Sequence, residues 1–145
     1  MTACDTNILF PALEASHANH APARAWLDDQ VENQSFVICE LNLLELYLLV
    51  RSATISKRPL DAPSAVAVIE SLRTNPAWRL IDYPGGLMPE VWRVAGRPGM
   101  ARRRIVDTRL SLVLRHHGVT HFATANEKDF ADFGFKRVWN PLRTS

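Results

Sequence analysis

Short apolar segments alternate with longer helical segments along this chain, and this alternation limits the possible folds more than any other feature. Five apolar segments have the length and composition of β-strands, at 2–4, 35–39, 78–81, 122–124 and 135–139. Apolar residues at helical spacing, together with capping residues, predict helices between them at 17–32, 40–50, 61–74, 89–95 and 105–117. Strands that alternate with helices predict an α/β fold, a parallel sheet with helices on both faces.

The length of 145 residues predicts one domain, spanning 1–145, with a core of its own. The sequence contains no internal repeat and no linker long enough to separate two domains. No apolar run approaches the ~20 residues that cross a bilayer, and the N-terminus lacks the basic and apolar segments of an export signal. We therefore expect a cytoplasmic protein with no membrane partner.

Charge is distributed unevenly between the two parts of the chain. Residues 1–50 carry a net charge of −6 and residues 51–145 a net charge of +8, and fourteen of the seventeen basic residues are arginine. Arg102, Arg103 and Arg104 stand just before Asp107. Such a run is either a solvated face or a lip that binds phosphate around an acidic centre, since arginine suits bidentate phosphate contacts.

The two cysteines, Cys4 and Cys39, form neither a zinc-binding pattern nor a disulfide framework. Both lie in short apolar segments, so we expect buried free thiols. A catalytic thiol paired with a histidine is the alternative, but no nucleophile motif accompanies either cysteine.

Two helices carry acidic residues among apolar ones. The helix at 40–50 is apolar nearly all round, so we expect it to be largely buried, with Leu44 and Leu48 beside Glu45. A carboxylate in that position is costly unless it is paired or binds a metal ion. In the helix at 105–117, Val106 begins an apolar stripe that Leu110, Val113 and Leu114 continue, and Asp107 lies beside it.

Further acidic residues stand where strands end. Asp5 follows the first apolar segment, and Asp129 lies in the turn after 122–124. Because the carboxyl ends of parallel strands meet at one edge of a sheet, we expect Asp5, Asp107 and Asp129 to converge, with Glu45 pointing to the same edge. Carboxylates without Cys or His ligands fit Mg²⁺ or Mn²⁺ better than zinc.

Each of these acids also has a structural interpretation. Asp5 is a common type of helix N-cap residue. A buried basic partner could neutralise Glu45. Asn126 and Asp129 have the spacing of a capping box, which would give Asp129 a structural role.

The acidic blocks, taken in order, resemble those of PIN-domain ribonucleases, and in particular those of the bacterial VapC-type toxins. They comprise Asp5-Thr6-Asn7, Glu45 in Leu-Leu-Glu-Leu-Tyr, Asp107 in the helix that ends in His-His-Gly, and Thr-Ala-Asn-Glu-Lys-Asp-Phe at 124–130. The resemblance covers essentially the whole chain and implies a PIN-like parallel sheet of four to five strands. It also implies a Mg²⁺-dependent endoribonuclease (Mn²⁺ being the alternative ion), usually a homodimer, which acts as the toxin of a type II toxin–antitoxin pair.

The same resemblance assigns roles to single residues. It implies that Asp5 and Asp107 hold the metal ion, that Glu45 ligates it directly or through water, and that Asp129 completes the catalytic set. The family often has an acid where this chain has Asn126, so the fourth acidic role falls on Asp129 or is lost, and with it a second metal ion.

Two further groups of residues are predicted to contact the RNA. The residues expected to position the substrate are Asn7, Thr124 and Asn126. The residues expected to bind the RNA backbone are Arg102, Arg103 and Arg104. The same backbone is present in every RNA, so these residues do not identify the substrate.

A different class of function uses the same fold. The chain could be a catalytically weak or inactive module that binds RNA or an antitoxin. Asp5, Glu45 and Asp107 favour the enzyme, whereas the missing acid at Asn126 favours the inactive module. The cognate antitoxin, which the resemblance implies as a partner, would block the acidic site with its C-terminal segment.

Overall fold

The computed structural model describes residues 1–143 and contains five short strands, all of them parallel. Strands β1 (Thr2–Cys4), β4 (His121–Ala123) and β5 (Arg137–Trp139) form one sheet in the order β1-β4-β5. Strands β2 (Val37–Cys39) and β3 (Arg79–Ile81) form a second pair, and a parallel bridge between Thr2 and Phe36 joins β2 to β1. The spatial order is therefore β3-β2-β1-β4-β5, which confirms the predicted parallel α/β fold.

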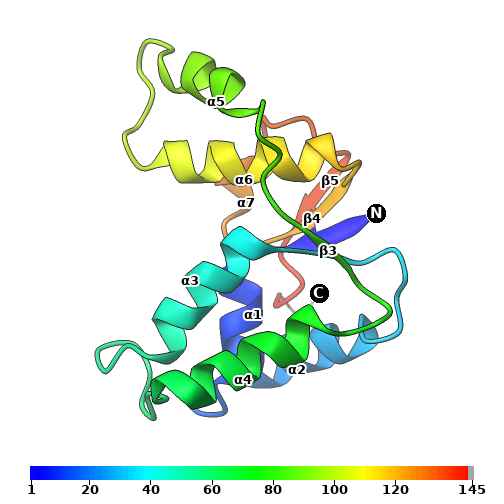
Figure 1. Cartoon of the computed structure of the whole chain (residues 1–145), viewed down its shortest axis with the longest axis vertical. Coiled ribbons are helices and arrows are strands. Elements are labelled where there is room, and N and C mark those ends of the chain that lie inside the picture. The colour runs from blue at the N-terminus through cyan, green and yellow to red at the C-terminus, as the bar shows by residue number, and fades with distance from the viewer. Residues whose placement is uncertain (144–145) are drawn as a thin grey trace.

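Helices cover both sides of these strands (Figure 1). One side carries α1 (Thr6–Leu13), α2 (His20–Asp29), α3 (Glu40–Val50) and α4 (Ala62–Arg73). The other carries α5 (Met88–Ala95), α6 (Arg104–His116) and α7 (Glu127–Phe130). Within residues 1–143, no helix is long and apolar enough to cross a membrane.

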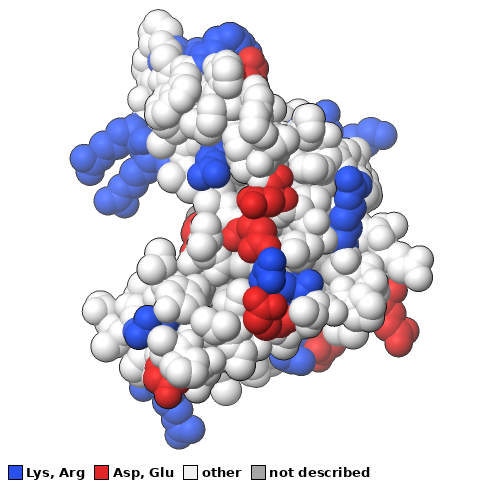
Figure 2. Space-filling model, in the orientation of Figure 1, with Lys and Arg blue, Asp and Glu red and all other residues white. Residues whose placement is uncertain are grey.

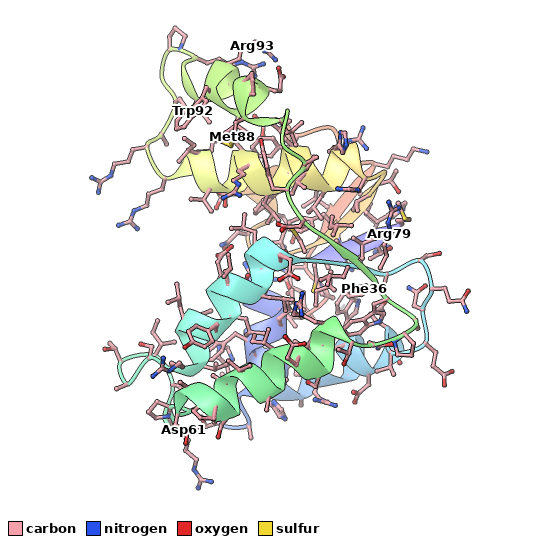
Figure 3. The ribbon with its side chains drawn as sticks, viewed as in Figure 1. Phe36, Asp61, Arg79, Met88, Trp92 and Arg93 are labelled. Atoms are coloured by element: carbon pink, nitrogen blue, oxygen red, sulfur yellow. The ribbon has the colours of Figure 1, made fainter. Side chains whose placement is uncertain are left out.

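Side chains that alternate along the strands supply two separate cores. Cys4 and Ile38 face the cluster that α1 to α4 cover, whereas Ala3 and Val37 face the cluster under α6 and α7. Phe36 is fully buried in the first cluster, where Figure 3 shows it beneath the chain that leads to β3. Both cysteine thiols, on β1 and β2, are buried and free, as predicted.

Local signals fixed several helix ends. The carboxylate of Asp61, which Figure 3 labels at one end of α4, accepts a hydrogen bond from the Ser64 backbone N–H at 2.8 Å and caps this helix. Gly118 has a φ of +85° directly after α6, a conformation that favours glycine. Helix α2 starts at His20, three residues later than His17, where we expected it to begin.

Two expectations about burial were wrong. Helix α3 is not largely buried, because the side chains of Leu44 and Leu48 are 62% and 67% exposed. They lie one helical turn apart, so they form an apolar strip on the outer face of α3. Val106 is 47% exposed and does not belong to the buried stripe that Leu110, Val113 and Leu114 form.

Candidate active site

The candidate site lies where the order of the strands reverses. From β1 the chain moves outward through β2 to β3, and it then returns to β4 and β5 on the opposite side of β1. The carboxyl ends of β1 and β4 therefore flank a topological switch point, which is where open parallel sheets place their ligands. Asp5 follows β1 directly, and Thr124 follows β4.

Asp5 is held by hydrogen bonds from two directions. Its Oδ1 accepts from the Thr6 backbone N–H at 2.7 Å, and its Oδ2 accepts from the Thr124 hydroxyl at 2.9 Å. Its backbone N–H donates to the Ala123 carbonyl at 2.9 Å, which ties the end of β1 to the end of β4. Asp5 is the N-cap of α1 as well as a site residue. The two interpretations of this residue are compatible.

Thr124 and Asn7 were predicted to position substrate. Burial argues against this role for Thr124, whereas for the half-buried Asn7 it stays a prediction. Thr124 is fully buried, so its side chain cannot contact an RNA. Its hydroxyl donates to Asp5 and accepts from Asn7 Nδ2 at 3.3 Å and from the Asn126 backbone N–H at 3.1 Å. The Asn7 Oδ1 accepts from the Ala125 N–H at 3.1 Å. These two side chains hold Asp5 and the turn after β4 in place.

Glu45 from α3, Asp107 from α6 and Asp129 from α7 lie near enough to Asp5 for their charges to interact. Withdrawal from water, followed by the charges of Asp5 and Asp107, raises the pKa of Glu45 to about 7. Withdrawal from water, followed by the charges of Asp5 and Asp129, raises the pKa of Asp107 to about 6, and Arg104 opposes this rise. The site thus gathers the four predicted acids from four separate segments.

The pKa of Asp5 is also raised. Burial is the main cause, and the Asp129 charge adds to it, while the hydrogen bonds from Thr124 and Thr6 work in the opposite direction. The two donors favour the ionised carboxylate and partly offset the effect of burial on the pKa of Asp5. The raised pKa values of Asp5, Glu45 and Asp107 together indicate that the site lacks positive charge.

The ion pairs of the described residues show whether a basic partner neutralises Glu45. Among residues 1–143, no Lys or Arg forms an ion pair with Glu45, so a buried basic partner does not explain it. In the same range, no group of three or more His, Cys, Asp or Glu side chains is arranged to hold a metal ion by itself. The donor set nevertheless fits Mg²⁺, which proteins usually bind through one or two carboxylates while it keeps several waters.

The Asn126 side chain does not cap α7. The capping-box interpretation of Asn126 and Asp129 therefore lacks its first hydrogen bond, although the Asp129 N–H donates to the Asn126 carbonyl at 3.1 Å. Both side chains are exposed. Asp129 is the acid of this turn whose charge acts on Asp5 and Asp107.

One buried polar pair was missed in the sequence. Asn42 on α3 donates from Nδ2 to the Thr6 hydroxyl at 3.1 Å, and that hydroxyl donates to the Asn42 carbonyl at 3.4 Å. The pair fixes α3 against the start of α1 and so places Glu45, one turn further along, opposite Asp5. An asparagine inside an otherwise apolar helix was the available signal.

The three arginines before Asp107 have different surroundings. Arg102 and Arg103 are exposed and form no ion pair with a residue in the described range, 1–143. Arg104 forms an ion pair with Asp132, and its guanidinium carbon lies 4.8 Å from the centroid of the Phe133 ring. Figure 2 shows an indented surface between α6 and α3, with basic side chains projecting at its upper edge.

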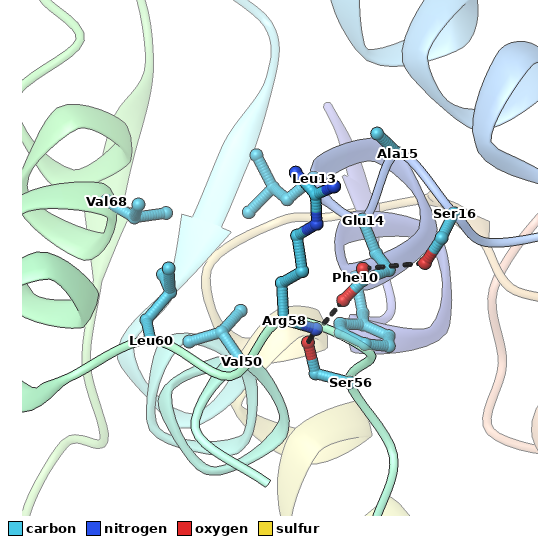
Figure 4. A pocket seen from close by; sticks show the side chains of 10 residues that line it. All are labelled: Phe10, Leu13, Glu14, Ala15, Ser16, Val50, Ser56, Arg58, Leu60 and Val68. Atoms are coloured by element: carbon cyan, nitrogen blue, oxygen red, sulfur yellow. Dashed lines mark hydrogen bonds between the residues drawn. The ribbon is translucent and has the colours of Figure 1, made fainter. Parts of the chain in front are cut away.

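A cavity of about 510 Å³ lies away from the four acids (Figure 4). It opens at the C-terminal ends of α1 and α3, whereas the acids gather at the N-terminal end of α1. Its walls are mostly apolar, and Arg58 and Glu14 are the charged residues that line it. Glu14 accepts hydrogen bonds from Ser56 at 2.5 Å and from Ser16 at 2.8 Å. The cavity is therefore separate from the acidic site.

The raised pKa of Glu45 predicts how the metal-free protein responds to pH. A carboxyl whose pKa is higher in the folded state than in the unfolded state costs stability once pH rises above the unfolded value. At pH 8 in chelator, Glu45→Gln should therefore raise the melting temperature by about 2–4 °C, or about 1 kcal/mol after allowance for solvent screening.

The same comparison at pH 5 is the control, because Glu45 is then largely protonated in the folded protein. The gain in melting temperature should shrink there. Equal gains at both pH values would show that the Glu45 charge is not repelled in the folded protein. The measurement is thermal unfolding followed by circular dichroism.

Solved structures of other proteins share this fold. The solved structure of VapC20 from Mycobacterium tuberculosis, described as a toxin that cleaves the sarcin–ricin loop, superposes with a TM-score of 0.65 at 16% identity over 84% of this chain and 87% of that one. The structure of FitAcB from Neisseria gonorrhoeae superposes with a TM-score of 0.66 at 20% identity over 99% and 100% of the two chains. No protein-family model matches the sequence.

The parallel sheet and these structural neighbours show that the chain has the PIN-like fold. Sequence comparison identifies the family within this fold. Ribonuclease VapC24 from Mycobacterium tuberculosis is 45% identical over 142 residues, which are 98% of this chain and 97% of that protein. The chain belongs to the VapC family of ribonucleases, and the predicted family and PIN-like fold are confirmed.

Proposed function

We propose that this protein is a metal-dependent endoribonuclease, formed by one domain over 1–145, which acts as the toxin of a type II toxin–antitoxin pair. The observation that carries the proposal is the gathering of Asp5, Glu45, Asp107 and Asp129 from four segments at the switch point of the sheet. The family supports the same activity, since its relative VapC24 is named a ribonuclease. The proposed location is the cytoplasm.

Asp5 and Asp107 are the proposed metal ligands. Asp5 is fixed by its two hydrogen bonds, and Asp107 faces it from the first turn of α6. Mg²⁺, or Mn²⁺ in its place, would supply the missing positive charge, lower the pKa of a bound water and offset charge on a phosphodiester. Ligation by two carboxylates leaves coordination positions for water and for a substrate phosphate.

The other two acids have supporting roles in the proposal. Glu45, whose pKa of about 7 lies near neutral pH, is suited to accept a proton from an attacking water at its carboxylate, or to bind the ion through a water. Asp129 takes the fourth acidic role, because its charge acts on both Asp5 and Asp107. Asn126, which is exposed beside it, remains available to contact the substrate.

A catalytically weak or inactive module that binds RNA or antitoxin is the second candidate, and the neutral Asn126 favours it. Purified protein, freed of any antitoxin, separates the two candidates. It should cleave RNA in Mg²⁺, stop in excess chelator and resume when Mg²⁺ is restored. Binding of RNA without any metal-dependent cleavage would support the inactive module instead.

The proposed partners are an RNA substrate, a cognate antitoxin and a second copy of the chain. A dimer would cover the apolar strip of Leu44 and Leu48 on α3, which is otherwise exposed to water. Leu48→Glu should therefore shift the protein from dimer to monomer in sedimentation experiments. Ile55→Glu is the control. It changes a residue that is 55% exposed in the loop after α3, and it should leave the sedimenting particle a dimer. A dimer that survives Leu48→Glu would place the interface elsewhere.

Arg102 and Arg103 are proposed to contact the RNA backbone, since both are exposed just before α6. Each phosphate contact with single-stranded RNA releases counterions, so log K falls with log salt by about 0.7 per contact. Replacing both with Ala should flatten the slope by about 1.4 in metal-free binding titrations. Arg24→Ala, which breaks an exposed pair with Asp28 on α2, is the control. An unchanged slope would assign both arginines to another partner.

A further inference from the structure

A second pocket is lined by Arg104, whose charge also acts on Asp107 of the acidic site. It encloses about 350 Å³ between the loop that joins α5 to α6 and the turn that follows α7. Arg97, Pro98 and Met100 line it from the first side, and Asp132 and Phe133 from the second. This volume falls within the range of about 300–1,000 Å³ that small-molecule sites occupy.

One wall of the pocket is a flat, fixed platform. The guanidinium of Arg104 covers the Phe133 ring at 4.8 Å, and its ion pair with Asp132 holds it there. Phe133 itself packs against Phe130, whose ring centroid is 6.1 Å away and whose side chain is buried. The Arg104 side chain is 30% exposed, so it keeps an accessible surface for another planar group.

The same arginine connects the pocket to the acidic site. Arg104 precedes Asp107 by one helical turn on α6, about 4.5 Å along the helix axis. The two side chains lie near each other on one side of the helix. A group in the pocket would therefore be a close neighbour of a phosphate at the acids.

The charges around the pocket indicate what kind of group it accepts. Two arginines, Arg97 and Arg104, are balanced by two acids, Glu90 and Asp132. A phosphate would need an excess of positive charge, which this pocket lacks. A neutral planar group with donors and acceptors at its edge fits better, because the platform can stack on it and the charged groups can hydrogen-bond to its edge.

We propose that this pocket binds one unstacked nucleobase of the RNA, beside the phosphate that is cleaved, with the base stacked on Arg104. This inference rests on the proposed ribonuclease activity. Proteins read single-stranded RNA by stacking unpaired bases on aromatic rings or on arginine planes. The pocket would then set a sequence preference at one nucleotide next to the cleavage site.

The test first maps a cleavage site of the wild-type protein in total RNA, in Mg²⁺. A short synthetic RNA with this site is then compared with versions that lack the base at one position at a time but keep every phosphate. At one position next to the cut, removal of the base should slow wild-type cleavage about tenfold, the usual effect of one stacked base.

Arg104→Lys keeps the charge beside Asp107 but removes the stacking plane. This variant should cleave the intact RNA about tenfold more slowly, and removal of the base should slow it no further. Arg24→Lys makes the same change at an exposed arginine of α2, outside the proposed RNA contacts, and should respond to base removal as the wild type does. Equal melting temperatures of the variants and the wild type exclude a folding defect.

The outcomes separate the two proposals. If the wild type cleaves RNA and Arg104→Lys responds to base removal as strongly as the wild type, the nucleobase pocket is wrong and the ribonuclease stands. If Arg104→Lys changes only the affinity for the antitoxin, the pocket serves that partner, and the nucleobase assignment is also wrong. If the wild type cleaves no RNA, the proposed function fails, and the inference fails with it.

Discussion

Asp107→Asn should reduce RNA cleavage by about 10³-fold or more, because it removes one of two proposed ligands of the metal ion. The substitution keeps the size of the side chain and deletes its charge. Asp107 is half-buried and has a pKa raised to about 6 by withdrawal from water and by Asp5 and Asp129. In chelator the neutral amide should therefore leave the melting temperature equal to that of the wild type or slightly higher.

Cleavage rates and melting curves, each measured with and without Mg²⁺, check this prediction. Mg²⁺ should raise the melting temperature of the wild type more than that of the variant. Asp28→Asn removes an exposed carboxylate from α2 and should behave as the wild type does in both assays. A melting temperature that falls by many degrees in Asp107→Asn would mean that the carboxylate supports the fold instead.

Thr124→Val should slow cleavage by about 10- to 100-fold, the usual cost of losing a residue that orients a metal ligand. Valine has nearly the same shape, so the fully buried position stays filled. The Thr124 hydroxyl donates to Asp5 at 2.9 Å and accepts from Asn7 and from the Asn126 N–H. Without it, Asp5 loses one of the two hydrogen bonds that favour its ionised form, and its pKa rises further.

The affinity for Mg²⁺ gives this prediction a second readout, because a less acidic and less ordered Asp5 should bind the ion more weakly. Thr108→Val is the matched control. It removes another fully buried hydroxyl, which donates to the Arg104 carbonyl at 2.8 Å within the same helix. If both variants slow cleavage equally, the effect belongs to buried threonines in general and not to the contact with Asp5.

The sequence predicted the strands and most helices because local signals determine them. Helix α3 was predicted with the bounds it has in the structure, and β1 likewise. The exposure of Leu44 and Leu48 could not be predicted, because an apolar residue at helical spacing looks the same whether it packs inside the chain or against another molecule.

The sequence also predicted that the four acids lie near one another, because acids after strands and acids among apolar helical residues both stand out. The residues that hold these acids in place were not predicted. Thr124 holds Asp5 only because β1 and β4 pair in one particular register, with Cys4 opposite Ala123. The contact between Thr6 and Asn42 likewise depends on how α1 packs on α3. Such contacts depend on tertiary geometry, to which local patterns give no access.

The pairing of β1 with β4 also determines when the site can form during synthesis of the chain. Thr124 and Asp5 are separated by 119 residues along the chain, and Asp129 lies further on still. A ribosome that has synthesised the first hundred residues has therefore produced β1 to β3 but no complete site. The acidic centre can form only after residue 129 has been synthesised, so a nascent chain that ends before this residue should lack the proposed cleavage activity.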